Sequence, residues 1–210
     1  MRILVTAGPT REKIDPVRFL SNYSTGTFGY EIARAALRRG CRVTLISGPT
    51  CLKVPVGLKL IRVESAIQLR DAVKREAKKS DCLIMAAAVS DWCIKREVKN
   101  KIKRRPGKNR LELIENPDIL SEVSKNKGRL ISVGFALETE NLVKNAFKKL
   151  KEKNLDLIIA NQLSRKRNVF GDNAVDVLMI DRLGNKMAVR RKSKKALAEI
   201  VLDRILNFNR

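Results

Sequence analysis

A glycine-containing hexad at residues 24–29 has residue types and spacing that suggest phosphate binding. It reads Ser24-Thr25-Gly26-Thr27-Phe28-Gly29 and opens a segment with helical periodicity. Free backbone N–H groups at a helix N-terminus, together with the helix dipole, favour a phosphate group. Ser24, Thr25 and Gly26 are therefore candidate phosphate-binding residues, although glycines that serve only a turn and close helix packing would give the same pattern.

A dinucleotide site of the NAD type does not fit the surroundings of this hexad. The hexad does not directly follow the first predicted strand, residues 2–6. The second predicted strand, residues 42–47, leads into Gly48-Pro49 without a carboxylate that could bind a ribose hydroxyl. We therefore expect a phosphate-containing ligand other than NAD.

The chain is strongly basic, with 45 Lys and Arg against 22 Asp and Glu and a net charge of +23. Such a charge suits a small polyanionic substrate or a nucleic acid. Aromatic residues make up only 4% of the chain, which leaves few stacking platforms for single strands. A basic nucleic-acid-binding module on a Rossmann-like scaffold remains the alternative function.

Several catalytic devices are excluded by composition. The chain has no histidine, so it can form neither a Ser-His-Asp triad nor a histidine-activated thiol. None of the four cysteines forms a CxxC pair, and no histidine is present to complete a zinc site, so we expect reduced thiols without a catalytic role. No apolar run approaches the ~20 residues of a membrane span, and a cytoplasmic protein is expected.

Alternating strands and helices must position the candidate phosphate-binding residues. Strands are predicted at 2–6, 42–47, 58–63, 82–89, 111–114, 130–136 and 155–161, and helices at 28–39, 65–79, about 118–127, 141–153 and about 193–207. This alternation predicts an α/β fold, a doubly wound, mainly parallel Rossmann-like sheet in a single domain of residues 1–210. A mobile basic loop is expected at about 93–110 and a late β-hairpin flap at about 174–190. Ligands should bind where the strands end, at 7–26, 47–50, 86–110, 134–139 and 160–173.

A series of ordered motifs identifies a family resemblance. They are TAGPTREKIDPVRFLSNYSTG (6–26), AAAVSDW (86–92), KIKR (101–104), NPDIL (116–120), VGFALET (133–139) and LDLIIAN (155–161). In this order they resemble phosphopantothenoylcysteine synthetase, also called phosphopantothenate–cysteine ligase, the ligase half of the bacterial-type bifunctional coenzyme A biosynthesis protein. The flavin-dependent decarboxylase half of that protein has no counterpart in these residues, so no flavin is expected.

The resemblance implies a ligase reaction in two steps. The carboxylate of 4′-phosphopantothenate attacks the α-phosphate of a nucleotide, giving an acyl-nucleotide and pyrophosphate. The amine of L-cysteine then attacks the acyl carbon and releases the nucleotide monophosphate. In bacterial-type members the nucleotide is CTP and Mg²⁺ assists, although the residues alone leave ATP open and identify no metal ligands. A homodimer is also implied.

The resemblance assigns two catalytic residues. Asn22 matches the asparagine expected to position the acyl-nucleotide for the second step. Lys101 matches the lysine expected to support the first step. Lys103 and Arg104 complete its basic cluster, and Lys103 is a further candidate phosphate- or substrate-binding residue. The family usually has KxKK here, and Arg104 keeps the charge while changing the donor geometry.

The nucleotide site is implied by a larger set of residues. Without the family context, Phe135 would be assigned to the core, Asp91 to a turn or helix cap, and the lysine pair four residues apart to a solvated helix face. The implied nucleotide-binding residues are Met85, Ala86, Ala87, Asp91, Lys101, Pro117, Asp118, Ile119, Leu120, Phe135, Lys149 and Lys153.

Overall fold

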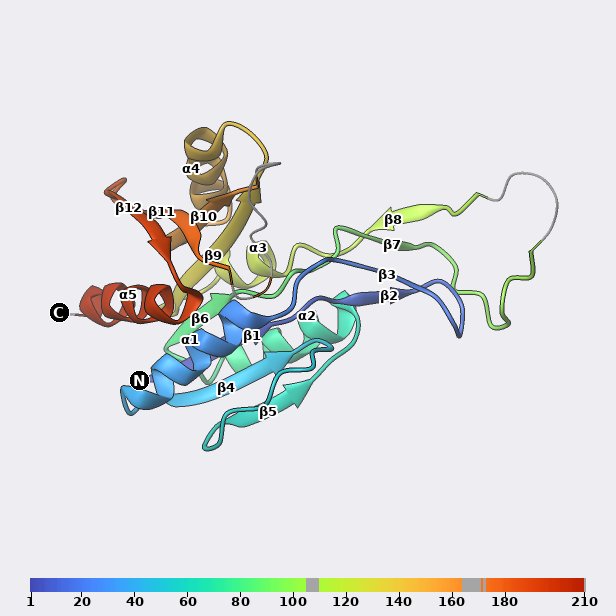
Figure 1. Cartoon of the computed structure of the whole chain (residues 1–210), viewed down its shortest axis with the longest axis horizontal. Helices are drawn as coiled ribbons and strands as arrows, with labels where there is room; N and C mark the ends of the chain where they lie inside the picture. The colour runs from blue at the N-terminus through green and yellow to red at the C-terminus, as the bar shows by residue number, and fades with distance from the viewer. Residues whose placement is uncertain (105–109, 164–170, 172, 210) are drawn as a thin grey trace.

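An eight-stranded sheet forms the centre of the molecule (Figure 1). The computed structural model describes residues 1–104, 110–163, 171 and 173–209. The strand order is β12-β11-β10-β9-β6-β1-β4-β5. Six strands are parallel, namely β1 (Arg2–Ala7), β4 (Arg42–Ser47), β5 (Lys59–Arg62), β6 (Cys82–Met85), β9 (Ile131–Glu138) and β10 (Leu157–Gln162). The predicted α/β, mainly parallel sheet is therefore confirmed.

Helices cover both faces of this sheet. α1 (Thr27–Arg38) and α5 (Lys194–Leu206) pack on one face, and α2 (Ala66–Ala77), α3 (Ile119–Ser124) and α4 (Leu142–Glu152) pack on the other. Neighbouring residues of each parallel strand point to opposite faces, so Val5 joins the first layer and Leu4 the second. This is why the strands appear in the sequence as continuous apolar runs. A short 3₁₀ helix, Asn207–Asn209, follows α5.

The strand predicted at 82–89 is too long, because β6 ends at Met85. The apolar residues that follow bond to the end of β1 and to the loop after it. The backbone N–H of Ala87 donates to Thr6 Oγ1 at 3.1 Å, and that of Ala88 donates to the Gly8 carbonyl at 2.9 Å. These bonds hold residues 86–88 at the end of the sheet as a binding loop.

Two small hairpin arms project from the end of the sheet at which the parallel strands finish (Figure 1). β2 (Arg11–Lys13) pairs with β3 (Phe19–Ser21), and β7 (Trp92–Ile94) pairs with β8 (Leu113–Glu115). The predicted strand exit at 7–26 is not a plain loop, because it contains the β2–β3 arm. The basic loop predicted at 93–110 is partly strand, and its residues 105–109 lie outside the described chain.

The late hairpin predicted at about 174–190 is present as β11 (Val175–Asp181) and β12 (Lys186–Lys192). It continues the main sheet instead of forming a separate flap, because β11 pairs antiparallel with β10. Val175, Val177 and Met179 are buried against the α5 layer, which explains why the hairpin cannot stand apart. Part of the predicted strand exit at 160–173 lies outside the described residues.

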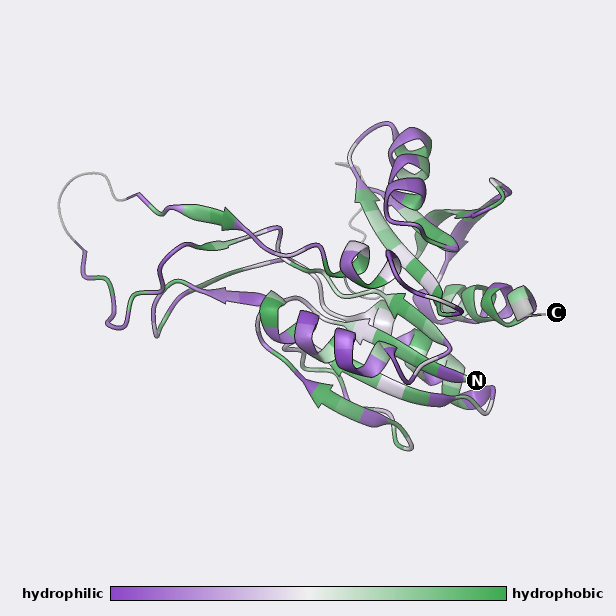
Figure 2. Cartoon of the chain, turned by 180° about the vertical axis from the view of Figure 1, so that it is seen from behind, coloured by the Kyte–Doolittle hydropathy of each residue, from purple (hydrophilic) through white to green (hydrophobic). Residues whose placement is uncertain are grey.

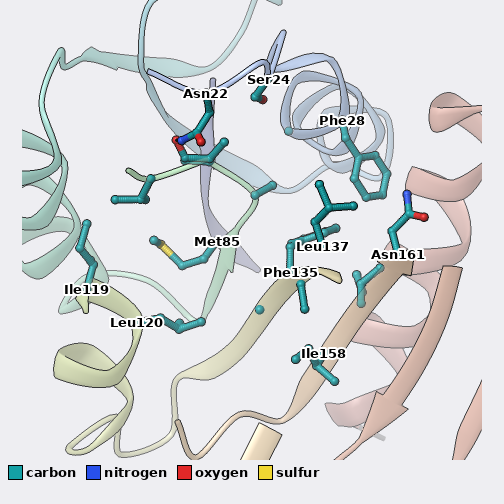
Figure 3. A pocket seen from close by; sticks show the side chains of 18 of the residues that line it. Asn22, Ser24, Phe28, Met85, Ile119, Leu120, Phe135, Leu137, Ile158 and Asn161 are labelled. Carbon is teal, nitrogen blue, oxygen red and sulfur yellow. The ribbon is translucent and has the colours of Figure 1, made fainter. Parts of the chain in front are cut away.

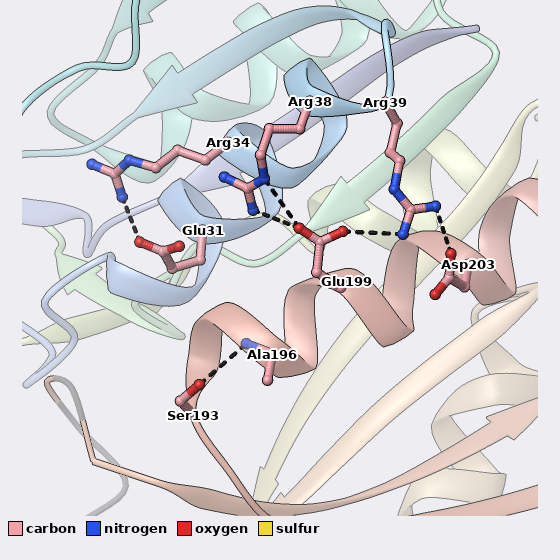
Figure 4. A network of polar contacts seen from close by, with 8 residues as sticks. All are labelled: Glu31, Arg34, Arg38, Arg39, Ser193, Ala196, Glu199 and Asp203. Carbon is pink, nitrogen blue, oxygen red and sulfur yellow. Dashed lines mark hydrogen bonds and ion pairs between the residues drawn. The ribbon is translucent and has the colours of Figure 1, made fainter.

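An ion-pair network fastens α5 to α1 (Figure 4). Glu199 accepts from the guanidinium groups of Arg38 at 2.6 Å and Arg39 at 3.1 Å, while Arg39 also contacts Asp203 at 2.6 Å. Ser193 caps the N-terminus of α5 by accepting from the Ala196 N–H at 3.2 Å. The last helix is thereby tied to the helix that starts at the hexad. Across the residues described, no helix combines the length and apolar character needed to cross a membrane.

Candidate active site

A cavity of about 810 Å³ opens at the carboxyl ends of β6, β9 and β10 (Figure 3). Its walls come from both faces of the sheet, with Phe28 of α1 on one side and Ile119 and Leu120 of α3 on the other. α1 follows β1 on one face, whereas α2 leads into β6 on the opposite face. The cavity therefore lies beside the topological switch point, where open α/β sheets bind their ligands.

The loops after β1 and β6 form the top of this cavity as one hydrogen-bonded unit. The carbonyl of Ala88 accepts from the Thr10 N–H at 3.1 Å and from Asn22 Nδ2 at 2.9 Å. The Ser90 N–H in turn donates to Thr10 Oγ1 at 3.0 Å. Because the Asn22 amide is held through its nitrogen, its orientation at the cavity wall is fixed.

The start of α1 carries the predicted phosphate-binding residues. Gly26 has a φ of 81°, and a side chain there would approach Thr50 Cγ2 at 2.8 Å, so this position requires glycine. The N–H of Gly26 donates to Ser24 Oγ at 3.3 Å, and that of Thr27 donates to Thr25 Oγ1 at 3.5 Å. The loop hydroxyls thus bind the N–H groups that an anion would otherwise contact.

Two lysines of the α4 region line the opposite wall, each paired with a carboxylate. Lys149 Nζ contacts Glu138 Oε1 at 2.7 Å, and Lys153 Nζ contacts Asp118 Oδ2 at 2.9 Å. Partial burial would raise the pKa of Asp118, but hydrogen bonds from Lys153 and the Ser121 N–H outweigh it and hold that pKa below its usual value. Asp118 is therefore ionised at neutral pH and balances the charge of Lys153.

The rest of the cavity has a mainly apolar wall. Phe28 and Phe135 meet edge to face, with 5.1 Å between ring centroids. Ile159, Val175 and Leu197 continue this wall along the α1–α5 face. The cavity thus combines a polar end with two cations and an apolar end, as expected for a ligand that carries both phosphate and hydrocarbon groups.

Most residues implied by the family resemblance line this single cavity. They are Asn22, Ser24, Thr25, Gly26, Met85, Ala86, Ala87, Asp91, Pro117, Asp118, Ile119, Leu120, Phe135, Lys149 and Lys153. Lys101 and Lys103 do not line it. They are exposed in the segment between β7 and the undescribed residues 105–109.

Other residues of the cavity were not predicted. Trp92 and Asn116 lie within the motifs AAAVSDW and NPDIL, and Asn161 ends the motif LDLIIAN, so their positions gave a usable signal. Asn116 Nδ2 donates to the Ser90 carbonyl at 2.9 Å, while its buried Oδ1 has no hydrogen-bond partner in the described structure. Lys194 and Val175 reach the cavity only through the packing of α5 and β11, which no local pattern indicates.

The carboxylates that line the cavity are the candidate protein ligands for Mg²⁺. In the described chain these are Asp91, Glu115 and Asp118, and Asp118 is engaged by Lys153. No cluster of three or more potential protein ligands occurs among the described residues. Mg²⁺ is commonly held by one or two carboxylates together with substrate phosphates, so Asp91 and Glu115 fit this mode.

Two cysteine thiols are poorly suited to nucleophilic chemistry. Burial raises the pKa of Cys82 far above its usual value, and burial together with the charge of Glu12 raises the pKa of Cys93. Because the thiolate is the reactive form, these shifts keep both groups mainly in the less reactive thiol form at neutral pH. Neither residue is among those that line the cavity.

Comparisons with known proteins agree with this geometry. Residues 1–208 match the family model of the DNA/pantothenate metabolism flavoprotein C-terminal domain. The coenzyme A biosynthesis bifunctional protein CoaBC of Bacillus subtilis is 43% identical over 204 residues, which cover 97% of this chain and 50% of that protein. The chain therefore spans about half the length of this curated relative.

Solved structures give the same assignment. The C-terminal domain of a CoaBC protein is 38% identical, with a TM-score of 0.83 over 97% of this chain and 93% of the other. The DNA/pantothenate metabolism flavoprotein from Streptococcus pneumoniae is 27% identical, with a TM-score of 0.86 over 99% of both chains. These matches confirm the resemblance seen in the motifs, and the chain belongs to the DNA/pantothenate metabolism flavoprotein C-terminal domain family.

Proposed function

We propose that this chain joins cysteine to 4′-phosphopantothenate in coenzyme A biosynthesis, through an acyl-nucleotide and with release of pyrophosphate. The observation that carries the proposal is the single cavity in which Asn22, the start of α1 and the lysine pair of α4 meet. The relationship to CoaBC proteins supports the pathway.

The first step needs positive charge around a triphosphate. The substrate carboxylate attacks the α-phosphorus, the bond to the β-phosphate oxygen breaks, and pyrophosphate leaves with the added negative charge. Lys149 and Lys153 can exchange their carboxylate partners for phosphate oxygens and stabilise that charge. Mg²⁺, when bound, supplies further neutralisation of the phosphates, and Asp91 and Glu115 would hold it.

The second step needs a correctly placed acyl group. The neutral amine of cysteine attacks the acyl carbon, the bond to the phosphate oxygen breaks, and the nucleotide monophosphate leaves. Asn22 is the residue we assign to this step, because its amide is fixed by the Ala88 carbonyl at the cavity wall. The proton that the amine loses can pass to the leaving phosphate or to solvent, so no histidine base is required.

The nucleotide in this proposal is CTP. The supporting argument is the bacterial character of the motifs and of the CoaBC relative from Bacillus subtilis. The base would lie near Phe135 and the small residues Ala86 and Ala87, whose backbone groups can approach a flat ring. Ser24, Thr25 and Gly26 are assigned to a phosphate group at the start of α1, which would replace the Ser24 and Thr25 hydroxyls at the N–H groups of Gly26 and Thr27.

Lys101 requires a second copy of the chain in this proposal. Residues 98–102 bond to the loop between β2 and β3, in the arms that extend away from the main sheet (Figure 1). Lys101 therefore cannot be assigned to the cavity of its own chain, and we assign it to that of a partner copy. The arms also expose apolar residues that a homodimer would cover, namely Val17, Phe19, Trp92, Val98, Leu111, Leu113 and Ile114.

The decisive experiment measures pyrophosphate release by the purified chain with 4′-phosphopantothenate, cysteine and Mg²⁺, comparing CTP, ATP, GTP and UTP. We expect release that requires 4′-phosphopantothenate and is fastest with CTP. Faster release with ATP would correct the nucleotide. No release from folded protein with any nucleotide would contradict the ligase function, and salt-sensitive RNA binding would then favour the nucleic-acid alternative suggested by the +23 charge.

Asn22→Ala separates the two steps. We expect acyl-nucleotide to form while amide formation falls by about 10²-fold, because a misplaced acyl group reacts that much more slowly. Quenched-flow analysis of the acyl-nucleotide and of the final amide measures both. Unchanged amide formation would remove Asn22 from the mechanism.

A further inference from the structure

The basic segment that carries Lys101 is fastened to the first arm by a buried carboxylate. Asp15, in the loop between β2 and β3, is only 2% exposed. Its Oδ1 accepts from the N–H groups of Val17 and Arg18, both at 2.9 Å. Its Oδ2 accepts from Arg18 Nε at 3.0 Å and from the Ile102 N–H at 3.1 Å. Oδ1 therefore stabilises the turn that contains Asp15, and Oδ2 binds the distant segment that carries Lys101.

Arg18 completes the attachment by binding the carbonyl of the same residue, Ile102. Its Nη2 contacts Asp15 and also donates to the Ile102 carbonyl at 3.0 Å. The Val98 N–H donates to the Ile14 carbonyl at 3.1 Å. The backbone is thus held on both sides of Lys101, although no described strand includes residues 98–102. The Arg18 guanidinium keeps the pKa of Asp15 far below its usual value, so the carboxylate stays ionised.

We propose that Asp15 and Arg18 form a latch that positions the Lys101 backbone for the activation step. The inference rests on the proposed function, because it gives the latch a role in forming the acyl-nucleotide. A lysine ammonium on a flexible stem is effective only where its backbone is well placed, and an error of about 1 Å can cost about 10²-fold in rate. Asp15 and Arg18 are positioning residues, since they act through the segment they hold.

Asp15→Asn is designed to break the contact with Ile102 while preserving the turn that contains Asp15. An asparagine Oδ1 can still accept from the Val17 and Arg18 N–H groups, which preserves the turn. Its Nδ2 would face the Ile102 N–H and the Arg18 guanidinium, so donors would meet donors. The matched control is Asp81→Asn. Asp81 likewise accepts a backbone N–H and a guanidinium, both from Arg2, at the opposite end of the sheet.

The experiment measures single-turnover pyrophosphate release by the full chain, with nucleotide affinity determined separately. We expect Asp15→Asn to slow release by about 10- to 100-fold with unchanged nucleotide affinity, and Asp81→Asn to leave both unchanged. In a Lys101→Gln background, Asp15→Asn should cause no further loss, because the latch acts through Lys101. Two losses that multiply would overturn the proposal, since they would indicate a separate structural effect.

Hydrogen exchange gives a readout that does not depend on activity. The peptide containing residues 98–102 should exchange at least about tenfold faster in Asp15→Asn than in the unaltered chain, while peptides of β1 and β6 stay protected. Unchanged exchange in that peptide would overturn the latch. Absence of pyrophosphate release by the unaltered chain would instead overturn the proposed function, so the two failures are distinguishable.

Discussion

The main sheet and the projecting arms differ in how they treat apolar side chains. In the sheet, residues such as Leu4, Ile84 and Leu157 are fully buried between helix layers. In the arms, Val17 is 59% exposed and Ile114 is 44% exposed. Figure 2 shows β8 coloured as hydrophobic although it lies away from the helix layers. Burial within the chain accounts for most apolar residues of the sheet, whereas the arms carry apolar residues that their own fold does not bury.

The two regions also differ in what holds them together. The sheet is secured by continuous strand pairing and by the ion pairs that join α1 to α5. The arms rely on short three-residue ladders and on local polar contacts such as the Asp15–Arg18 pair. A short two-stranded ladder is only marginally stable by itself in water. The sheet is therefore secured within one chain, and the proposed second copy would cover the apolar residues that the arms expose.

The largest predicted difference between the regions is in their contribution to stability. Leu157→Ala removes a fully buried side chain from β10 and should lower the free energy of unfolding by about 3 kcal/mol. Ile114→Ala, the matched change in an arm, should alter it by less than about 0.5 kcal/mol when measured on the monomer. Urea unfolding monitored by circular dichroism compares the two. Equal losses would show that the arms belong to the same cooperative core.

For self-association, in contrast to stability, we expect the larger effect from a substitution in an arm. Ile114→Asp places a charge on the exposed apolar surface of β8 and should weaken self-association by at least about tenfold. Far-UV circular dichroism should stay unchanged, since the residue is not in the core. Sedimentation equilibrium measures the dissociation constant, and Leu183→Asp, at a highly exposed position in the β11–β12 turn, is the control. A monomeric unaltered chain, or equal effects of both variants, would contradict the arm-mediated dimer.

The smallest predicted effect concerns the pH dependence of the α1–α5 network. Hydrogen bonds and charge from Arg38 lower the pKa of Glu199 below its unfolded value. The unfolded chain therefore binds the proton more readily, so this stabilisation is present at neutral pH and is lost as the pH falls below about 4. Glu199→Gln should lower the free energy of unfolding at pH 7 by about 0.5 kcal/mol.

The measurement is a set of urea midpoints from pH 3 to pH 7 for the unaltered chain and for Glu199→Gln. The difference between the two should shrink toward the acidic end. A difference that is independent of pH would mean that Glu199 acts through packing and not through its charge.

The sequence by itself determined the sheet and the position of its cavity. Buried parallel strands such as Leu157–Gln162 are continuous apolar runs, and helices such as Leu142–Glu152 repeat their apolar residues at helical spacing. Because the parallel strands end at one edge, residues as distant as Asn22, Asp91 and Phe135 could be expected in one cavity. The family motifs identified most of the remaining wall.

Only the tertiary structure determined how the arms form, where the last hairpin pairs and what surrounds Lys101. A three-residue strand is too short to show a clear alternation, so β7 could not be distinguished from the basic loop that follows it. The pairing of β11 with β10, and the bonds from Asp15 to Ile102, join residues far apart in the chain. Such contacts depend on packing and on buried polar groups finding partners, and periodicity records neither.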